Sequence, residues 1–209
     1  MTIYTGFVPL ADLPQGFVRE FSELLTAQEV TVSAQMTDLL QQNEWRCGRI
    51  LLRFLIAGAY GVPVNSIIIH TRSDGQMVAE TLAGQVRVSH ARIPRMWAGA
   101  TARAFPIGVD LVDVSAFPVN IDGAAVTADS WATLEALAKV TQRGLDWALS
   151  ADCYPVDGLI TAPDGDPYRV VSLPNLPPDV RAVLLGPADL NWDVRVIDII
   201  PNIYCGFNE

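Results

Sequence analysis

Two carboxylates could do chemistry because of the apolar residues that surround them. The first is Asp110, in the run from Gly108 to Val114, where Val109 and Leu111 predict a buried strand. Burying a carboxylate costs several kcal/mol unless a cation or a hydrogen-bond donor compensates it. Asp110 is therefore expected either to end the strand as a turn-forming residue or to hold a metal ion or a basic side chain.

The second carboxylate is Glu135, on a helix predicted from about residue 128 to 150. Trp131, Glu135, Lys139 and Arg143 are spaced four apart, so they share one face of that helix. One interpretation pairs Glu135 with Asp110 at a functional site. The other is a surface ion pair between Glu135 and Lys139, worth a few tenths of a kcal/mol.

A helix predicted from residue 43 to 60, capped by Asn43, carries three arginines. Arg46, Arg49 and Arg53 recur at i, i+3 and i+7 and share one face. Guanidinium groups match phosphate oxygens in a bidentate way, which indicates an anion-binding face. A solvated basic stripe beside acidic neighbours explains the same spacing, and spacing alone favours that interpretation.

Ser89 and His90 end an alternating strand predicted over residues 85 to 90. A lone histidine at a strand end is usually structural, although a serine and a histidine with arginines nearby could hold a phosphate. A cysteine acting with His90 is a further candidate nucleophile. It has little support, because buried cysteines usually just pack and no sequence context here marks an activated thiolate.

The composition is typical of a folded globular protein. The chain has 209 residues, of which 50% are hydrophobic and 18% charged, enough for one large domain or two small lobes. The net charge of −9 provides no basic stripe for nucleic-acid phosphates. No apolar run is long enough to span a bilayer, and the first residues lack the pattern of a signal peptide. An odd count of three cysteines suits a reducing compartment, so we expect a cytoplasmic protein with no nucleic-acid or membrane partner.

The order of predicted elements indicates the fold class. A long helix followed by strands occurs in each half of the chain, which suggests an α+β protein rather than a parallel sheet. We expect two similar lobes in a pseudo-two-fold arrangement, each a long helix packed on a small, mostly antiparallel sheet. The N-terminal lobe would cover residues 1–107 and the C-terminal lobe residues 108–209.

Six short motifs occur in an order that resembles the 4′-phosphopantetheinyl transferases of the monomeric, surfactin-synthetase-activating type. Those enzymes use Mg²⁺ to move the phosphopantetheine arm of coenzyme A onto a serine of an acyl or peptidyl carrier protein. The resemblance covers most of the chain, although no single motif is specific. The motifs are Leu24 to Glu29, Arg46 to Arg53, Asp74 to Met77, Val88 to His90, Gly108 to Asp110 and Trp131 to Lys139.

The resemblance implies a role for each candidate residue. Asp110 and Glu135 would bind Mg²⁺ beside the diphosphate of coenzyme A, and Glu135 would take the proton of the attacking serine. Lys139 would balance charge on the phosphate. Ser89 and His90 would contact the diphosphate. Further contacts to coenzyme A would come from Arg46, Arg49, Arg53 and Gln76, unless the arginines only organise the fold.

The chain also departs from the family pattern. Val112 occupies the place of a second strand acid, while Leu134 and Gln76 each replace a lysine that faces phosphate in the family. Each charge-assisted hydrogen bond is worth about 1.5–3 kcal/mol, so losing several would weaken coenzyme A binding by orders of magnitude. The alternative is therefore a divergent, inactive relative that binds a carrier protein or a coenzyme A-like ligand, or has other chemistry.

Overall fold

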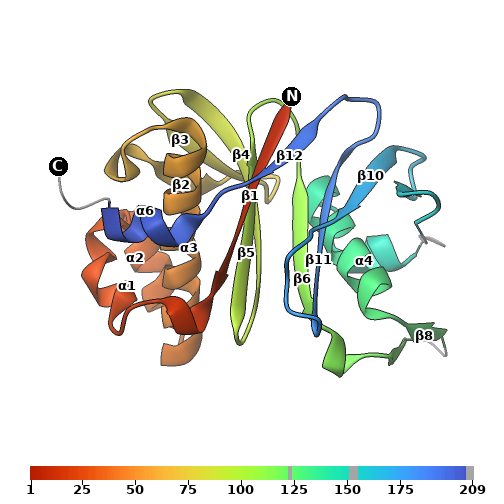
Figure 1. Ribbon diagram of the computed structural model, residues 1–209, viewed down its shortest axis with the longest axis horizontal. Coiled ribbons are helices and arrows are strands. Elements are labelled where there is room, and N and C mark those ends of the chain that lie inside the picture. Colours follow the sequence, from red (N-terminus) through yellow and green to blue (C-terminus); the bar gives the residue numbers. More distant parts are fainter. Residues whose placement is uncertain (122–123, 151–154, 206–209) are drawn as a thin grey trace.

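The protein is built in four layers, a helical layer, two β-sheets face to face, and a second helical layer (Figure 1). The computed structural model describes residues 1–121, 124–150 and 155–205. The long helix α3 (Leu39–Tyr60) covers the outer face of the first sheet, and α4 (Ala128–Thr141) covers the outer face of the second. A separate apolar core fills each of the three spaces between layers. The predicted α+β class is confirmed.

The first sheet has six strands in the order β12-β1-β5-β4-β3-β2. All neighbouring strands are antiparallel except β1 and β12, which are parallel. Its strands are β1 (Thr2–Pro9), β2 (Ile68–Thr71), β3 (Met77–Thr81), β4 (Gly84–Ile93), β5 (Met96–Ala102) and β12 (Asp193–Val196). Its outer face also carries the short helices α1 (Phe17–Glu20), α2 (Ala27–Ala34) and α6 (Ile199–Cys205).

The second sheet is antiparallel, with the order β6-β11-β10-β9. A two-stranded hairpin and a short helix, α5, accompany α4 on this side. The elements are β6 (Gly108–Asp113), β7 (Val119–Ile121), β8 (Ala124–Val126), α5 (Leu145–Leu149), β9 (Leu159–Thr161), β10 (Pro167–Ser172) and β11 (Val180–Pro187).

The predicted lobe boundary at residue 107 falls in the connection between β5 and β6. The end of the chain, however, returns to the first sheet, where β12 pairs with β1 and α6 packs against α3. Residues 193–205 thus lie with the elements of residues 1–107, and Ile199 and Ile203 of α6 are buried in the core between α3 and the first sheet.

Two predicted helix ends are wrong. The arginine helix begins at Leu39, because the side chain of Asp38, rather than Asn43, accepts a hydrogen bond from the Leu40 N–H. The helix predicted to reach residue 150 stops at Thr141, because Gln142 adopts a left-handed conformation at φ 61°. A non-glycine residue with positive φ cannot continue an α-helix, so α5 starts afresh after Gly144.

The strand β6 alternates between two environments, as a strand between two layers must. Val109 and Leu111 face the core between the sheets, whereas Asp110 and Val112 face α4. A Cβ atom at Gly108 would overlap the carbonyl oxygen of Ala136 in α4. Glycine therefore permits α4 to lie directly on the β6 backbone, next to Asp110.

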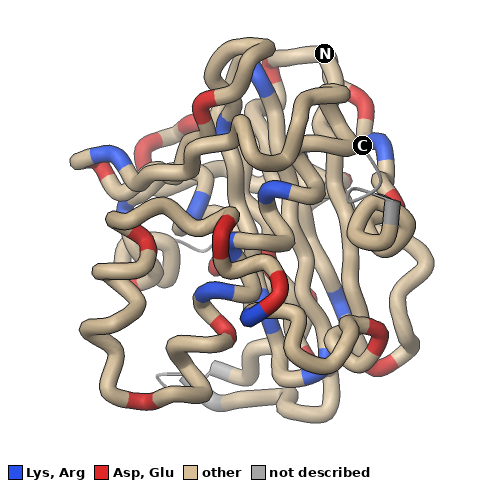
Figure 2. The backbone as a smooth tube through the Cα atoms, turned by 90° about the vertical axis from the view of Figure 1, so that its left-hand side faces the viewer, with Lys and Arg blue, Asp and Glu red and all other residues tan. Residues whose placement is uncertain are grey.

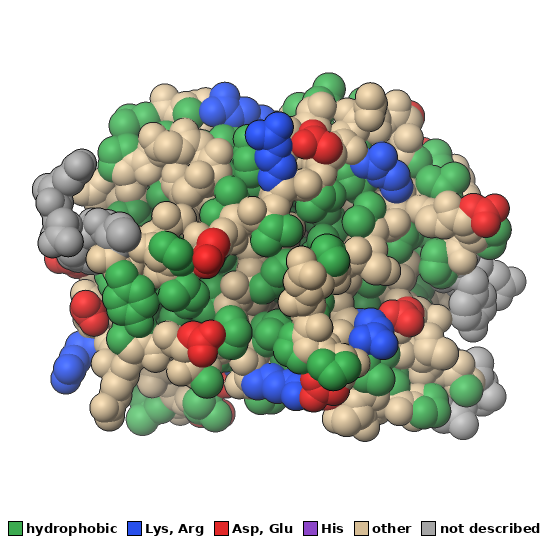
Figure 3. Space-filling model, in the orientation of Figure 1, with side chains coloured by type: hydrophobic (Ala, Val, Ile, Leu, Met, Phe, Trp, Pro, Cys, Tyr) green, Lys and Arg blue, Asp and Glu red, His purple; other side chains and the backbone are tan. Residues whose placement is uncertain are grey.

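Charged side chains are spread over the surface rather than gathered by sign. Figure 2 shows acidic and basic residues interspersed along the helical side of the first sheet. The face in Figure 3 likewise carries both signs, separated by apolar and neutral side chains. Within the described ranges, no helix combines the length and apolarity that crossing a membrane requires.

The contact at Gly108 predicts a stability effect. Gly108→Ala should lower the free energy of unfolding by about 3 kcal/mol, because the new methyl group meets backbone and α4 must move away. Urea denaturation measures this change. Gly186→Ala is the matched control, since its methyl group would meet only the Trp192 side chain, at 3.1 Å. Equal effects of the two substitutions would contradict the close packing of α4 on β6.

Candidate functional site

A cleft of about 400 Å³ lies between the first sheet and α4. Four predicted site residues line it: Ser89 and His90 from β4, and Glu135 and Lys139 from α4. Gln142, which sequence analysis did not single out, lines it as well. The structure thus joins side chains that lie about fifty residues apart in the chain.

Asp110 lies beneath this cleft and is paired with Lys139. The Lys139 ammonium donates to Asp110 Oδ1 at 2.6 Å and to the Val109 carbonyl at 3.1 Å. Asp110 is only 6% exposed. Burial raises the pKa of Asp110; Lys139 opposes this shift, and the charge of Glu135 adds to it. The charge of Glu135 therefore acts on the Asp110 carboxyl group, while the Lys139 ammonium links α4 to β6.

Three cations lie near His90. Burial, together with the charges of Lys139, Arg49 and Arg92, lowers the pKa of His90 to about 3. The imidazole is consequently neutral at neutral pH. Two of these cations are paired with carboxylates, Lys139 with Asp110 and Arg92 with Glu44, whereas Arg49 has two nitrogen atoms without a hydrogen-bond partner in the described part of the chain.

Ser89 connects the two sheets. Its hydroxyl oxygen accepts a hydrogen bond from the Val109 N–H at 3.0 Å, and the side chain is buried. A hydroxyl group can accept and donate at once, so Ser89 can also donate to a ligand in the cleft.

The three arginines of α3 have different surroundings, although their spacing is regular. Arg53 is fully buried, and its guanidinium donates to both carboxylate oxygens of Glu29, at 2.6 and 3.2 Å. It also donates to the Ile67 carbonyl. Arg46 donates to Ser33 Oγ at 2.8 Å. Because Arg53 is buried, the three arginines do not form a continuous solvated stripe. The hydrogen bonds of Arg53 connect α3 to other parts of the fold.

Arg49 is the exception among these arginines. It is only 8% exposed, yet Nε and Nη1 are buried with no hydrogen-bond partner among the described residues. Its guanidinium lies over the Trp45 ring, 4.8 Å from the centroid. Burial lowers the pKa of Arg49, with Glu29 opposing the shift. Buried donors without partners are rare in proteins, so Arg49 is the arginine best suited to meet an anionic ligand.

Gln76 is not among the residues that line the cleft, although its neighbours Gly75 and Met77 are. Its Oε1 atom accepts a hydrogen bond from Arg87 Nη1. Leu134 is buried in the core between α4 and the second sheet. Position 134 therefore faces the second sheet.

The side chains present allow a test of the expected Mg²⁺ site. No cluster of three or more His, Cys, Asp or Glu side chains suited to a metal ion occurs in the described part of the chain. Val112, on the same face of β6 as Asp110, supplies no oxygen. Mg²⁺ is often held by one or two carboxylates plus substrate phosphates. Asp110 and Glu135 fit such a site when a phosphate completes it and Lys139 leaves Asp110.

Cys47 does not fit the role of a nucleophile. It is buried on α3, and burial raises the pKa of its thiol to about 11. A thiol with this pKa is protonated at neutral pH and unreactive. Cys153 and the side chain of Cys205 lie outside the described residues.

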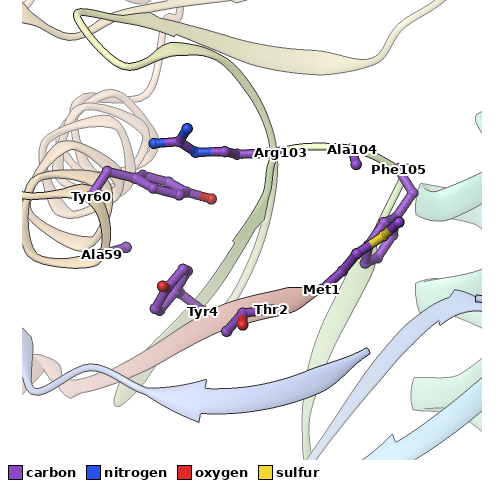
Figure 4. Close-up of a pocket in the computed structure, with 8 residues that line it drawn as sticks. All are labelled: Met1, Thr2, Tyr4, Ala59, Tyr60, Arg103, Ala104 and Phe105. Atoms are coloured by element: carbon purple, nitrogen blue, oxygen red, sulfur yellow. The ribbon is translucent and has the colours of Figure 1, made fainter. Parts of the chain in front are cut away.

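A second hollow of about 420 Å³ lies elsewhere, between β1, the end of α3 and the connection from β5 to β6 (Figure 4). Tyr4, Tyr60, Arg103 and Phe105 are among its lining residues. It contains no carboxylate and none of the predicted site residues. Of these two hollows, the cleft beside α4 is the one lined by the predicted acid–base residues.

No family model matches the chain, and none of the curated proteins is similar enough to match it.

The raised pKa of Asp110 predicts how stability depends on pH. Because the fold favours the protonated form, this group's contribution is present below its ordinary pKa of 3.8 and is lost as pH rises through the raised value. Asp110→Asn stays neutral, so its free energy of unfolding relative to the wild type should increase from pH 4 to pH 7. Denaturant titrations at both pH values measure this difference.

Asp113→Asn is the control of opposite sign. Hydrogen bonds from Ser115 lower the pKa of Asp113, so this substitution should cost more stability at pH 7 than at pH 3. A loss of stability by Asp110→Asn that grows with pH would show that the ionised Asp110–Lys139 pair stabilises the fold.

Arg53→Met should lower the free energy of unfolding by about 3–5 kcal/mol, because it leaves the buried Glu29 carboxylate without its cation and with only the hydrogen bond from the Thr26 N–H among the described residues. Adding Glu29→Gln should recover part of that loss. Arg49→Met removes two donors that have no hydrogen-bond partner among the described residues and one long hydrogen bond to Thr71 Oγ1, at 3.5 Å, so it should cost less. Urea titrations of the four proteins test this order, and a larger effect at Arg49 than at Arg53 would refute it.

Proposed function

We propose that this chain is a 4′-phosphopantetheinyl transferase, which moves the phosphopantetheine arm of coenzyme A to a serine of an acyl or peptidyl carrier protein in the presence of Mg²⁺. The observation that carries this proposal is the cleft. It gathers Ser89, His90, Glu135 and Lys139 beside the buried Asp110, which are the residues that the resemblance implies.

The proposal includes the pseudo-two-fold relation of the two halves and a location in the cytoplasm. The relation is supported by the layers, since α3 lies on the outer face of the first sheet as α4 does on the second. The net charge of −9 argues against a nucleic-acid partner.

Binding of the diphosphate would depend on the donors around the cleft. Ser89 and His90 line it directly. Arg49 is not one of its lining residues, but Nε and Nη1 of Arg49 are buried with no hydrogen-bond partner among the residues that the structure describes. Arg46, Arg53 and Gln76 are engaged by Ser33, Glu29 and Arg87, so in this proposal they hold the elements that carry the site. Coenzyme A thus contacts fewer cations than the resemblance alone implies.

Glu135 is the general base of the proposed reaction. Its carboxylate, directly or through water, takes the proton from the serine hydroxyl of the carrier protein. The serine oxygen then bonds to the phosphorus that carries pantetheine, and the bond from that phosphorus to the adenosine-bearing phosphate breaks. Lys139 moves from Asp110 to the phosphate oxygens, where its charge balances the charge that develops during displacement.

Asp110 and Glu135 are the residues that would hold Mg²⁺. When bound, the ion neutralises the diphosphate and orients it for displacement. Lys139 compensates the buried Asp110 carboxylate in the structure, and a bound Mg²⁺ would compensate it when Lys139 turns to the phosphate.

A second candidate is a divergent relative that binds a coenzyme A-like ligand or a carrier protein without transferring the arm. The observation that favours it is the Asp110–Lys139 pair, in which an ammonium group already takes the place of a metal ion. Val112 and Leu134 are buried apolar residues at positions where the family has charges.

Incubation with coenzyme A, Mg²⁺ and several apo carrier proteins tests the proposal. We expect intact-mass spectrometry to show one added phosphopantetheine mass on a carrier. Glu135→Gln should lower the rate by about 10²–10⁴-fold with an unchanged melting temperature, because it removes the base. The control is Glu23→Gln, which makes the same chemical change at an exposed residue distant in sequence from Glu135, and it should leave the rate unchanged.

Each other outcome selects an alternative. Full activity of Glu135→Gln would exclude this mechanism. Calorimetric binding of coenzyme A without any mass increase on the carriers would select the second candidate. If the protein neither binds coenzyme A nor transfers its arm, both candidates are rejected for this cleft.

A further inference from the structure

Two buried nitrogen atoms meet across Gly48 of α3. His90 Nδ1 and Trp97 Nε1 would lie 3.4 and 3.5 Å from a Cβ atom placed on Gly48. Both are buried and have no hydrogen-bond partner among the described residues. The two rings are roughly parallel, with 26° between their planes and centroids 6.4 Å apart. Both nitrogens, together with His90 Cε1 at 3.2 Å, therefore lie within contact distance of the position that a Cβ atom on Gly48 would occupy.

The chemistry of these two nitrogens is complementary. The indole nitrogen of Trp97 can only donate a hydrogen bond, and Trp97 is fully buried. A neutral imidazole has one donor and one acceptor nitrogen, and a neighbouring donor decides which is which. Buried polar groups are almost always paired, either directly or through an ordered water molecule.

We infer that Trp97 and Gly48 set the tautomer of His90 through one buried water molecule. The Trp97 N–H donates to the water, and the water donates to His90 Nδ1. The imidazole proton is thereby kept on Nε2, the ring nitrogen that a ligand in the cleft can reach. Trp97 is a positioning residue in this arrangement, since it acts on the ligand only through His90.

The role of this tautomer in binding coenzyme A rests on the proposed function. Because burial lowers the pKa of His90 to about 3, the ring does not offer donors on both nitrogens at neutral pH. Only the Nε2–H tautomer donates a hydrogen bond into the cleft, where an oxyanion of a phosphate group can accept it. The Nδ1–H tautomer would present a lone pair to that oxyanion and repel it.

Imidazole ¹⁵N chemical shifts, which distinguish the two tautomers, test the inference without any ligand. The chain has two histidines, so the measurement is made on a His70→Gln background, in which His90 is the only one. We expect a single Nε2–H tautomer at pH 7. Trp97→Phe, which removes the donor, and Gly48→Ala, which places a methyl group beside both nitrogens, should each produce a mixture of tautomers.

The same variants should weaken binding of inorganic pyrophosphate, measured by calorimetry, by about tenfold, the equivalent of one hydrogen bond. A matched pair of controls exists at the second sheet, where Gly186 faces Trp192, whose indole N–H donates to the Pro187 carbonyl. Gly186→Ala and Trp192→Phe make the same chemical changes away from His90, so neither should alter its tautomer.

An Nδ1–H or doubly protonated His90 in the wild type would overturn the inference. So would an unchanged tautomer in both Trp97→Phe and Gly48→Ala. Because the tautomer is measured without coenzyme A or a carrier protein, a protein that transfers nothing can still confirm it. Conversely, active transfer with the wrong tautomer would reject only the role of Trp97.

Discussion

The direct contact of α4 with β6 at Gly108 is the constraint on which the site depends. Because no side chain separates the two backbones there, the helix is held at a fixed height above the strand. Lys139, one turn beyond Ala136, then reaches Asp110, and Glu135 lies close enough to raise the pKa of that carboxyl. A bulkier residue at position 108 would separate these groups, since packed interiors transmit small displacements.

Buried charges divide into two kinds in this protein. Arg53 and Glu29 satisfy each other and connect α3 to α2, which is what a structural ion pair does. Arg49 is also buried, but two of its nitrogen atoms have no hydrogen-bond partner among the described residues. The same is true of Nδ1 in His90, a neutral and half-buried side chain nearby. Incompletely paired polar groups cost stability, and they are concentrated where ligands bind. Both kinds occur on or beside the same helix, one turn apart.

The cleft resolves an apparent conflict between the net charge and the proposed anionic substrate. The chain is acidic as a whole, yet Lys139, Arg49 and Arg92 all act on His90. Local charges in a partly buried site outweigh distant surface charges, which water and salt screen. An acidic surface is therefore compatible with the proposed anionic substrate.

The sequence by itself determined the α+β class, the buried carboxylate at Asp110 and the helical face that carries Glu135 and Lys139, because apolar periodicity reports local burial directly. It could not tell Arg49 from Arg53, whose spacing is equivalent; Glu29, twenty-four residues from Arg53, decides that difference. Nor did it indicate that β12 pairs with β1, or that Trp97 lies across Gly48 from His90. These partners are distant in the chain, and only the packing of the layers brings them together.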